Sequence, residues 1–319
     1  MLNEQLITEL FSEDCNVIFA AVYGSYARNE AAYLVDKDGK SNLYNDFDMV
    51  LVVRDKKLFA KRFLKYKERM SDIVGGCDVD FLVIDKPISR KVKSSIWYKD
   101  FCHCTRILLG GETEMEHYFG SSITYDVAVF DVYALFITRS WTAGSLSSKL
   151  TKEPFNEIYK GYQAAKLVIA IVDIFLLMHS KYETLLKDKL KALRYIDGEF
   201  ATMLAEKLIL AIEVKMSPSK DIFSKAIQDE GYVENLIDSY NHVFSAYLKS
   251  NLFACDLMLS IYMNVRYLKF LVLNRDRTVS EKLKLRHKQA RVVRAYERKR
   301  NINDFNSQMA AILIRHESL

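Results

Sequence analysis

The stretch NDFDMVLVV, residues 45–53, decides how the rest of this chain is interpreted. Asp46 and Asp48 open it, and the apolar run Met49 to Val53 follows them. The apolar run predicts a strand held in a core, and the aspartates mark the end at which it leaves that core. Because side chains alternate along a strand, the two carboxylates project from one face, about 7 Å apart. They can therefore converge on one site.

Strand and helix patterns alternate on both sides of this stretch. Asp38-Gly39 between β-favouring flanks predicts a hairpin within residues 31–44, inserted ahead of the aspartates. The other expected elements are strands at 17–23, 46–53, 78–84 and 105–111 and helices at 56–73 and 88–100. This order predicts a short mixed sheet flanked by helices.

Beyond about residue 125 the patterns favour helices alone. The expected helices cover 125–142, 154–179, 183–214, 219–248, 252–274 and 279–316. The break GSSIT at 120–124 separates the two kinds of pattern. We therefore expect an α+β chain, with a domain of mixed sheet and helices at 1–122 and an all-α helical-bundle domain at 123–319.

Composition indicates a folded protein of the cytoplasm. Half of the 319 residues are hydrophobic, and the net charge is +5. The start of the chain has no signal-peptide pattern, and five cysteines without one indicate reduced thiols. The most apolar run, 167–178, is too short to span a bilayer and contains Asp173, so we expect a core helix and no membrane span.

Positive charge gathers near the end of the chain. Residues 281–300 hold nine Lys and Arg against two Glu. We interpret this segment as the solvated face of a C-terminal helix. Contact with phosphates, a membrane surface or an acidic partner is the alternative. Nucleic acid is therefore a less favoured partner, and a homo-oligomer is compatible with the sequence.

A second pair of aspartates repeats the opening pattern at the next strand. Asp78 and Asp80 stand where Asp46 and Asp48 stand on theirs. Like charges held close together repel unless a cation lies between them. Oxygen ligands of this kind suit Mg²⁺ or Mn²⁺. We expect a metal site made by Asp46, Asp48 and one acid of the later strand.

Gly24 and Ser25 supply the second half of the expected site. They stand where the strand at 17–23 leads into a helix, so main-chain N–H groups and the hydroxyl can hold phosphate oxygens. Arg28, three residues after Ser25, can reach phosphate or remain solvated. A phosphate cradle beside an acidic metal site predicts phosphoryl or nucleotidyl transfer.

This order of motifs resembles the polymerase-β-like nucleotidyltransferase superfamily over roughly residues 15–112. The similar segments are Val22–Ser25, Asp46-Phe47-Asp48 and Val79–Phe81. More narrowly, YGSYARNE, NDFDMVLV and TRILLGG resemble nucleotidyltransferase-like proteins of bacterial surface-polysaccharide gene clusters. The sequence departs from the wider pattern in one respect. Twenty residues separate Ser25 from Asp46, more than the pattern has, and the hairpin at 31–44 can accommodate them.

The resemblance implies a role for each site residue. Gly24 and Ser25 would contact a triphosphate, and Asp46 and Asp48 would hold the metals. Asp80 would bind the catalytic metal and help deprotonate the acceptor hydroxyl.

Three further residues carry alternatives. Asp78 is the rival of Asp80 for the third carboxylate. Arg28 and Lys166 would contact phosphates, and the competing interpretation of Lys166 is a lysine at the edge of a buried helix.

The activity implied is Mg²⁺-dependent transfer of NMP from an NTP to a hydroxyl or phosphate of a small molecule or sugar, with a place in surface-polysaccharide biosynthesis. Alternatives with the same site are RNA or cyclic-oligonucleotide synthesis and protein AMPylation. A binding protein that keeps the fold without catalysis is a third class. The base of the NTP and the acceptor stay open.

Overall fold

The structure is a computed structural model that describes residues 4–35, 39, 41–44, 46–120, 157–218 and 232–250, with residues 127, 131, 132, 135 and 139. The chain forms two compact units. The first comprises Met1–Val127 with Thr184–Asp188 and Lys215–Ser219. The second comprises Ala128–Glu183, Lys189–Val214 and Lys220–Leu319.

A mixed sheet of four strands forms the centre of the first unit. Its strands are β1 (Val17–Val22), β4 (Phe47–Val53), β5 (Val79–Ile84) and β6 (Arg106–Leu109), in the order β5-β4-β1-β6. Strands β4 and β5 are parallel, and β1 is antiparallel to both β4 and β6. The expected α+β class with a small mixed sheet is therefore confirmed for this unit.

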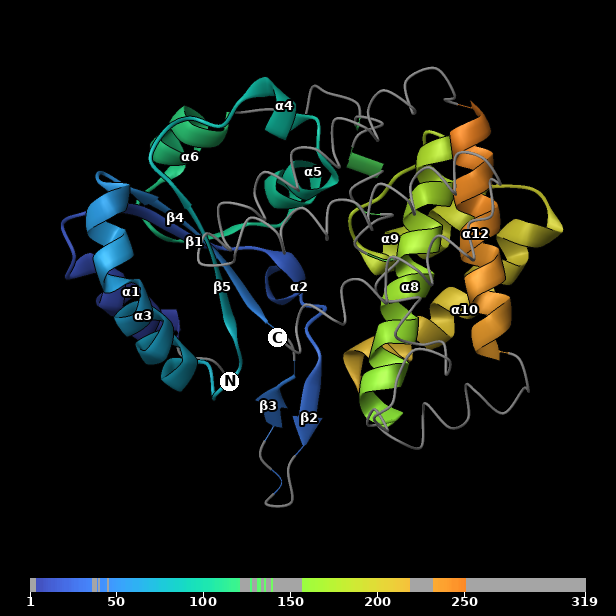
Figure 1. Cartoon of the computed structure of the whole chain (residues 1–319), viewed down its shortest axis with the longest axis horizontal. Helices are drawn as coiled ribbons and strands as arrows, with labels where there is room; N and C mark the ends of the chain where they lie inside the picture. Colours follow the sequence, from blue (N-terminus) through green and yellow to red (C-terminus); the bar gives the residue numbers. More distant parts are fainter. Residues whose placement is uncertain are drawn as a thin grey trace, which may run out of the picture. The chain divides into compact units, whose positions relative to one another are not determined.

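Helices cover both faces of the sheet (Figure 1). Helices α1 (Glu4–Ser12) and α3 (Lys56–Ile73) pack on one face, where Met49 and Leu51 of β4 are buried. Helices α5 (Ile96–His103) and α6 (Glu112–Phe119) pack on the other, where Val50 and Val52 are buried. Because side chains alternate along β4, Asp48 faces the same side as Val50, the side of α5.

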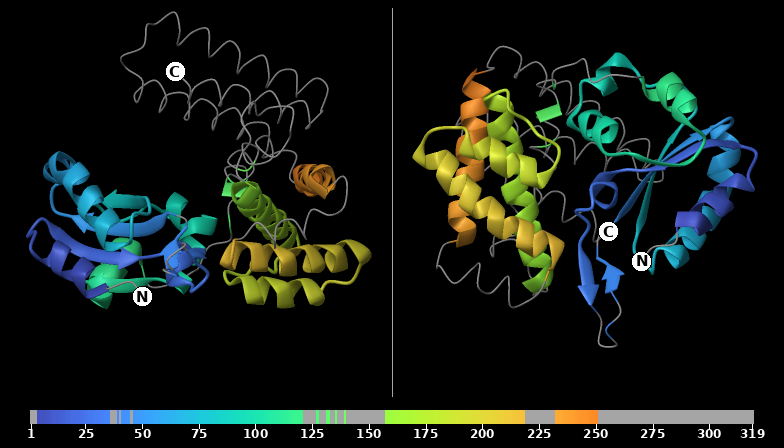
Figure 2. Two further views of the ribbon diagram at one scale, coloured as in Figure 1. Left: turned by 90° about the horizontal axis from the view of Figure 1, so that it is seen from below. Right: turned by 180° about the vertical axis from the view of Figure 1, so that it is seen from behind.

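The hairpin expected within residues 31–44 is present. Strands β2 (Tyr33–Val35) and β3 (Ser41–Leu43) form an antiparallel sheet of their own (Figure 2). Along the chain they come between α2 (Gly24–Ala27) and β4. Ala32 is buried at its base, and its carbonyl accepts a hydrogen bond from the Tyr44 N–H at 2.9 Å. The insertion is therefore anchored where it joins the domain.

Several boundaries differ from the sequence-based expectation. The helix expected at 88–100 is two helices, α4 (Arg90–Lys93) and α5, and the sequence patterns did not predict α1 or α6. The single helix expected at 183–214 is also two, α9 (Leu186–Arg194) and α10 (Glu199–Met216). Gly198, with φ 129°, lies in the break between α9 and α10, where a left-handed residue cannot continue a helix.

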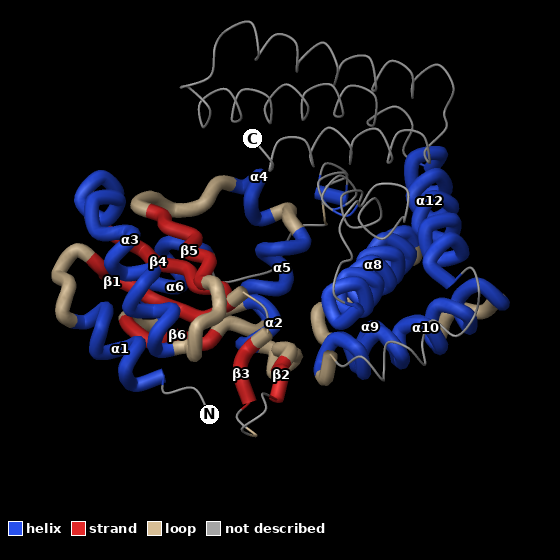
Figure 3. The backbone as a smooth tube through the Cα atoms, turned by 60° about the horizontal axis from the view of Figure 1, so that its bottom comes forward, coloured by secondary structure: helices blue, strands red, loops and turns tan. Residues whose placement is uncertain are grey.

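Every regular element described in the second unit is a helix. Helices α8 (Glu157–Met178) and α12 (Tyr232–Ser250) pack side by side (Figure 3), and most of α9 and α10 belongs to the same unit. The helices expected at 252–274 and 279–316, the basic segment 281–300 and most of 125–142 lie outside the described residues. A complete helical-bundle domain therefore stays a prediction.

Helix α8 extends well before the apolar run 167–178 from which a core helix was expected. Residues Ile158–Met178 are long and apolar enough to cross a membrane, but most of this segment is buried inside the fold. The core helix of a folded domain can have the same length and apolar composition. Asp173 within α8 is paired with Lys189 of α9. The expectation of no membrane span stays a prediction.

Helix α3 begins and packs as its sequence predicts. The Asp55 side chain accepts hydrogen bonds from the N–H groups of Lys57 and Leu58, at 2.7 and 3.2 Å, and so caps the helix. Its inward face is held in the core by three buried side chains, Phe59, Tyr66 and Met70. This face fixes the position of the helix on the sheet.

The outward face of α3 is charged in a way that disfavours the helix. Lys56 and Lys57 occupy the first turn, which contains no acidic residue, although the positive end of the helix dipole repels cations there. Lys57, Lys61, Lys65 and Arg69 then follow at intervals of four residues, where like charges repel. Each like-charge pair costs roughly 0.2–0.5 kcal/mol of helix stability.

A buried carboxylate ties α3 to the start of β1. Asp14 is 6% exposed and accepts hydrogen bonds from the Tyr66 hydroxyl at 2.6 Å, from Arg62 at 3.0 Å and from the Asn16 N–H at 3.0 Å. Burial raises the Asp14 pKa, but these three donors outweigh it, and the pKa lies below its usual value. Burial and the bond to Asp14 raise the pKa of Tyr66 to about 12.

Tyr66→Phe is expected to destabilise the protein at neutral pH by about 1.5–3 kcal/mol, because it removes a donor to a charged acceptor. Because the folded-state pKa of Asp14 is lowered, the hydrogen bond from Tyr66 contributes its full stabilisation above the unfolded-state pKa of about 3.9. It is lost as the pH falls through the lower folded-state value. Urea unfolding of both proteins at pH 7 and in an acid series checks this. Tyr195→Phe, at a side chain that is 78% exposed, is the control and should change little. A pH-independent difference would contradict the assignment.

Candidate metal centre

Three of the predicted carboxylates meet at one end of the sheet. Asp46, Asp48 and Asp80 each offer an oxygen atom, and these oxygens all lie within 4.8 Å of one another. Asp48 and Asp80 are direct neighbours in the parallel register of β4 and β5, so their side chains share a face. Asp46 lies just before β4, on the same face two residues earlier. We call these three residues the carboxylate cluster.

The structure separates the two rivals for the third position. Asp78 lies before β5 begins, its side chain is 65% exposed, and it forms an ion pair with Lys67 of α3 at 2.8 Å. The hydrogen bond from Lys67 lowers the Asp78 pKa. Asp80 is the residue that the structure brings into the cluster. The catalytic roles of these residues stay predictions.

Electrostatics within the cluster favour a bound cation. Burial raises the pKa of Asp80, and the charges of Asp46 and Asp78 raise it further, while Lys67 lowers it. A divalent cation among the three oxygens would relieve this repulsion. Carboxylate oxygens alone are the donor set that Mg²⁺ and Mn²⁺ prefer. The three residues therefore fit such an ion.

Gly24 allows the turn after β1 to lie directly against the cluster. It adopts φ 73°, and a Cβ atom at this position would lie 2.2 Å from Oδ2 of Asp48. The N–H of Tyr23 also donates to the main-chain carbonyl of Asp48 at 3.1 Å. Only glycine fits here without displacing the carboxylate. Gly24, at the start of α2, thus borders the carboxylate cluster, and the phosphate-binding role of Gly24 and Ser25 stays a prediction.

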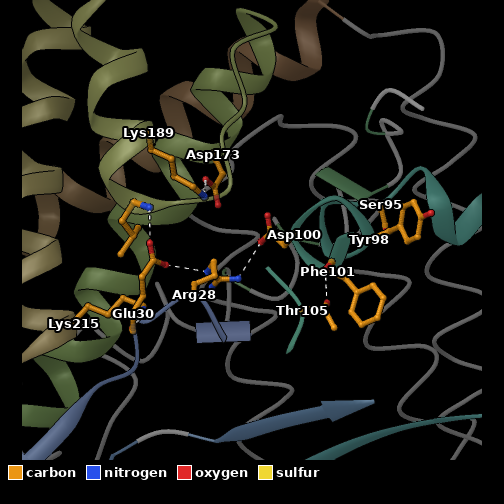
Figure 4. Close-up of polar contacts among 11 residues, drawn as sticks. Arg28, Glu30, Ser95, Tyr98, Asp100, Phe101, Thr105, Asp173, Lys189 and Lys215 are labelled. Atoms are coloured by element: carbon orange, nitrogen blue, oxygen red, sulfur yellow. Dashed lines mark hydrogen bonds and ion pairs between the residues drawn. The ribbon is translucent and has the colours of Figure 1, made fainter. Parts of the chain in front are cut away.

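Arg28 is held by two carboxylates in this structure (Figure 4). Its guanidinium lies 2.9 Å from Glu30 and 3.5 Å from Asp100. Glu30 is 8% exposed, and it also accepts the N–H of Leu186, which belongs to the same unit, at 2.6 Å. Contact between Arg28 and a phosphate would have to compete with this network. The predicted phosphate role of Arg28 stays a prediction.

Lys166 lies on α8, in the second unit. Its ammonium group lies over the ring of Tyr162, 4.8 Å from the centroid. Its role as a phosphate contact stays a prediction.

Sequence patterns did not single out Tyr23 as a site residue. Its ring packs edge-on against Trp97 and Phe101, with centroids 5.7 and 6.0 Å away. Burial raises the Tyr23 pKa, and so do the charges of Asp48 and Asp80, so the phenol stays protonated beside the cluster. The alternation of side chains along β1 could have identified it, because Phe19, Ala21 and Tyr23 share the face of the sheet that α5 covers.

Lys67 was also missed, because the pattern of α3 alone gives no reason to choose it among the other cations of that helix. Only the tertiary fold brings its ammonium to Asp78.

Comparison with known proteins adds no assignment. No protein-family model matches the chain, and no curated protein matches its sequence. The chemistry of the carboxylate cluster therefore carries the functional argument.

Proposed function

We propose that the chain is a nucleotidyltransferase that uses Mg²⁺ or Mn²⁺ to move NMP from an NTP to a hydroxyl or phosphate of a small molecule or sugar. The observation that carries this proposal is the convergence of Asp46, Asp48 and Asp80 within 4.8 Å, directly beside Gly24. A hard-cation site bordered by a tight turn that follows a strand is the minimal equipment for this reaction.

In the proposed reaction, the acceptor oxygen attacks the α-phosphorus, the bond from that phosphorus to the bridging oxygen breaks, and pyrophosphate leaves. When bound, the divalent cations would align the two oxygens and stabilise the charge on the leaving group. Asp46 and Asp48 would hold the ions. Asp80 would complete the ligand set and, where the acceptor is a hydroxyl, take up its proton. The N–H groups at Gly24 and Ser25 would orient the phosphates.

The remaining details rest on the resemblance of the motifs. A sugar acceptor, a place in surface-polysaccharide biosynthesis and a cytoplasmic location follow from it as proposals. RNA, a cyclic oligonucleotide or a protein hydroxyl would use the same carboxylates. Because these alternatives differ only in the acceptor, an unbiased search for products separates them.

The test is to incubate the purified protein with Mg²⁺, each NTP and candidate acceptors, with mass spectrometry of all products and of the protein. We expect pyrophosphate release that depends on both the metal and the NTP. Asp80→Asn should reduce pyrophosphate release by more than about 100-fold. Loss of a residue that only supports a metal ligand costs up to about that much, and loss of the ligand itself should cost more.

Asp78→Asn is the matched control, because it makes the same change two residues away, outside the carboxylate cluster. It breaks an ion pair at a side chain that is 65% exposed, so the rate should fall by no more than about fivefold. Equal losses in the two variants, or the larger loss in Asp78→Asn, would contradict the proposed ligand set.

A further inference from the structure

A row of cations follows the outward face of α3. Lys57, Lys61, Lys65 and Arg69 are all exposed, and we call these four residues the cationic ridge. None of them forms an ion pair with any residue in the described part of the chain. The helical rise places consecutive members about 6 Å apart along the axis.

The ridge opposes the stability of the helix that bears it. Its members repel one another at four-residue spacing, and Lys57 adds to the unfavourable charge of the first turn. Glu68 and Asp72 share the outward face but form no ion pair with the ridge. Arrangements that break a local rule are expected at functional surfaces.

The ridge is also preformed. Phe59, Tyr66 and Met70 bury the opposite face of α3, and Arg62 anchors the helix to Asp14. The cations therefore project from a rigid element, and little ordering is needed when an anionic surface meets them.

The neighbours of the ridge indicate what kind of anion it meets. Leu64, between Lys61 and Lys65, is 71% exposed, and Ala60 is exposed on the same face. The exposed residues of α3 include no aromatic, amide or hydroxyl side chain that could stack on or read a base. Lysines around an exposed leucine suit a surface with anionic headgroups above an apolar layer.

We propose that the cationic ridge of α3, with Leu64, docks the protein on an anionic lipid bilayer. Lipid phosphates and carboxylates would supply the ion-pair partners that the ridge does not find among the described residues. The lysine stems and Leu64 would contact the upper acyl region. This surface is distinct from the carboxylate cluster, and its function does not depend on the proposed reaction.

The test measures sedimentation of the full chain with vesicles of phosphatidylcholine that contain about 30% phosphatidylserine, and with pure phosphatidylcholine vesicles. We expect binding to the anionic vesicles alone, weakening as salt rises. Replacing all four ridge residues with Gln should lower the partition coefficient by roughly 100-fold or more. Leu64→Gln should lower it by about threefold or more.

The matched control removes four exposed cations elsewhere, through Lys86→Gln, Lys187→Gln, Lys191→Gln and Arg194→Gln, and should keep most of the binding. Equal loss in the control, or no loss on removing the ridge, would overturn the proposal. Ridge-dependent binding to a duplex oligonucleotide without binding to anionic vesicles would overturn it in favour of nucleic acid. Asp48→Asn should bind vesicles as the wild type does, so this proposal and the proposed function can fail separately.

Discussion

Asp48→Asn is expected to lower NTP-dependent pyrophosphate release by roughly 10³-fold or more, the scale seen when a central catalytic group is removed. Asp48 is the hub of the carboxylate cluster. It is the register partner of Asp80, its carboxylate lies against Gly24, and its main-chain carbonyl accepts the Tyr23 N–H. Asparagine keeps this shape but removes one of the charges that a divalent cation would need.

The same substitution should leave the folded state at least as stable as the wild type. Three carboxylates within 4.8 Å repel one another without a cation, so removing one charge relieves the repulsion. Loss of activity without loss of stability is the signature of a residue kept for function. A charge that served only to stabilise the fold would give the opposite result.

Urea unfolding and Mn²⁺ binding by calorimetry, measured alongside the pyrophosphate assay, check this prediction. Asp85→Asn is the control, since Asp85 is an exposed carboxylate just beyond the other end of β5. It should change none of the three measurements appreciably. Asp48→Asn protein that binds Mn²⁺ and turns over at the wild-type rate would remove the basis for the proposed function.

The sequence predicted the site because the features that build it are local. Alternation along β4 places Asp46 and Asp48 on one face, and the run from Met49 to Val53 predicts the buried strand behind them. Gly24 comes just after the apolar strand β1, so its position is also predicted from the residues beside it. Each inference needs only neighbouring residues and the period of a strand.

Alternation could not choose between Asp78 and Asp80, because residues two apart share a face. The choice depends on where β5 begins and on Lys67, which α3 brings to Asp78. Arg28 shows the same limit. Nothing near it in sequence predicts Asp100, 72 residues away, as a partner. Partners supplied by other elements decide which charged side chains remain available to a ligand.

Helix boundaries were missed for a different reason. Helices α1 and α6 are nine and eight residues long, too short for the hydrophobic period to stand out. The break between α9 and α10 carried a signal, since Asp197-Gly198 is a turn dipeptide, but the continuous apolar spacing on both sides outweighed it.

Gly24→Ala is expected to damage both the fold and the metal site, and Gly76→Ala provides the comparison that separates the causes. Both glycines have positive φ, 73° and 87°, so alanine is strained at each by about 1–2 kcal/mol. Alanine also reduces the entropy of the unfolded chain equally at both positions. The two backbone effects therefore cancel when the variants are compared.

The difference between the variants lies in what the new methyl group meets. At Gly76 nothing lies within 4 Å, whereas at Gly24 the Asp48 Oδ2 atom lies 2.2 Å away. Asp48 must move, at a further cost of about 1–3 kcal/mol. Because displaced ligands bind metal poorly, Mn²⁺ affinity should fall by more than about tenfold in Gly24→Ala and stay unchanged in Gly76→Ala. Equal unfolding free energies and equal Mn²⁺ affinities would mean that the Gly24 turn does not support the carboxylate cluster. A deficit confined to Gly24→Ala would support the close approach of this turn to Asp48 as the contact that holds the carboxylate cluster in place.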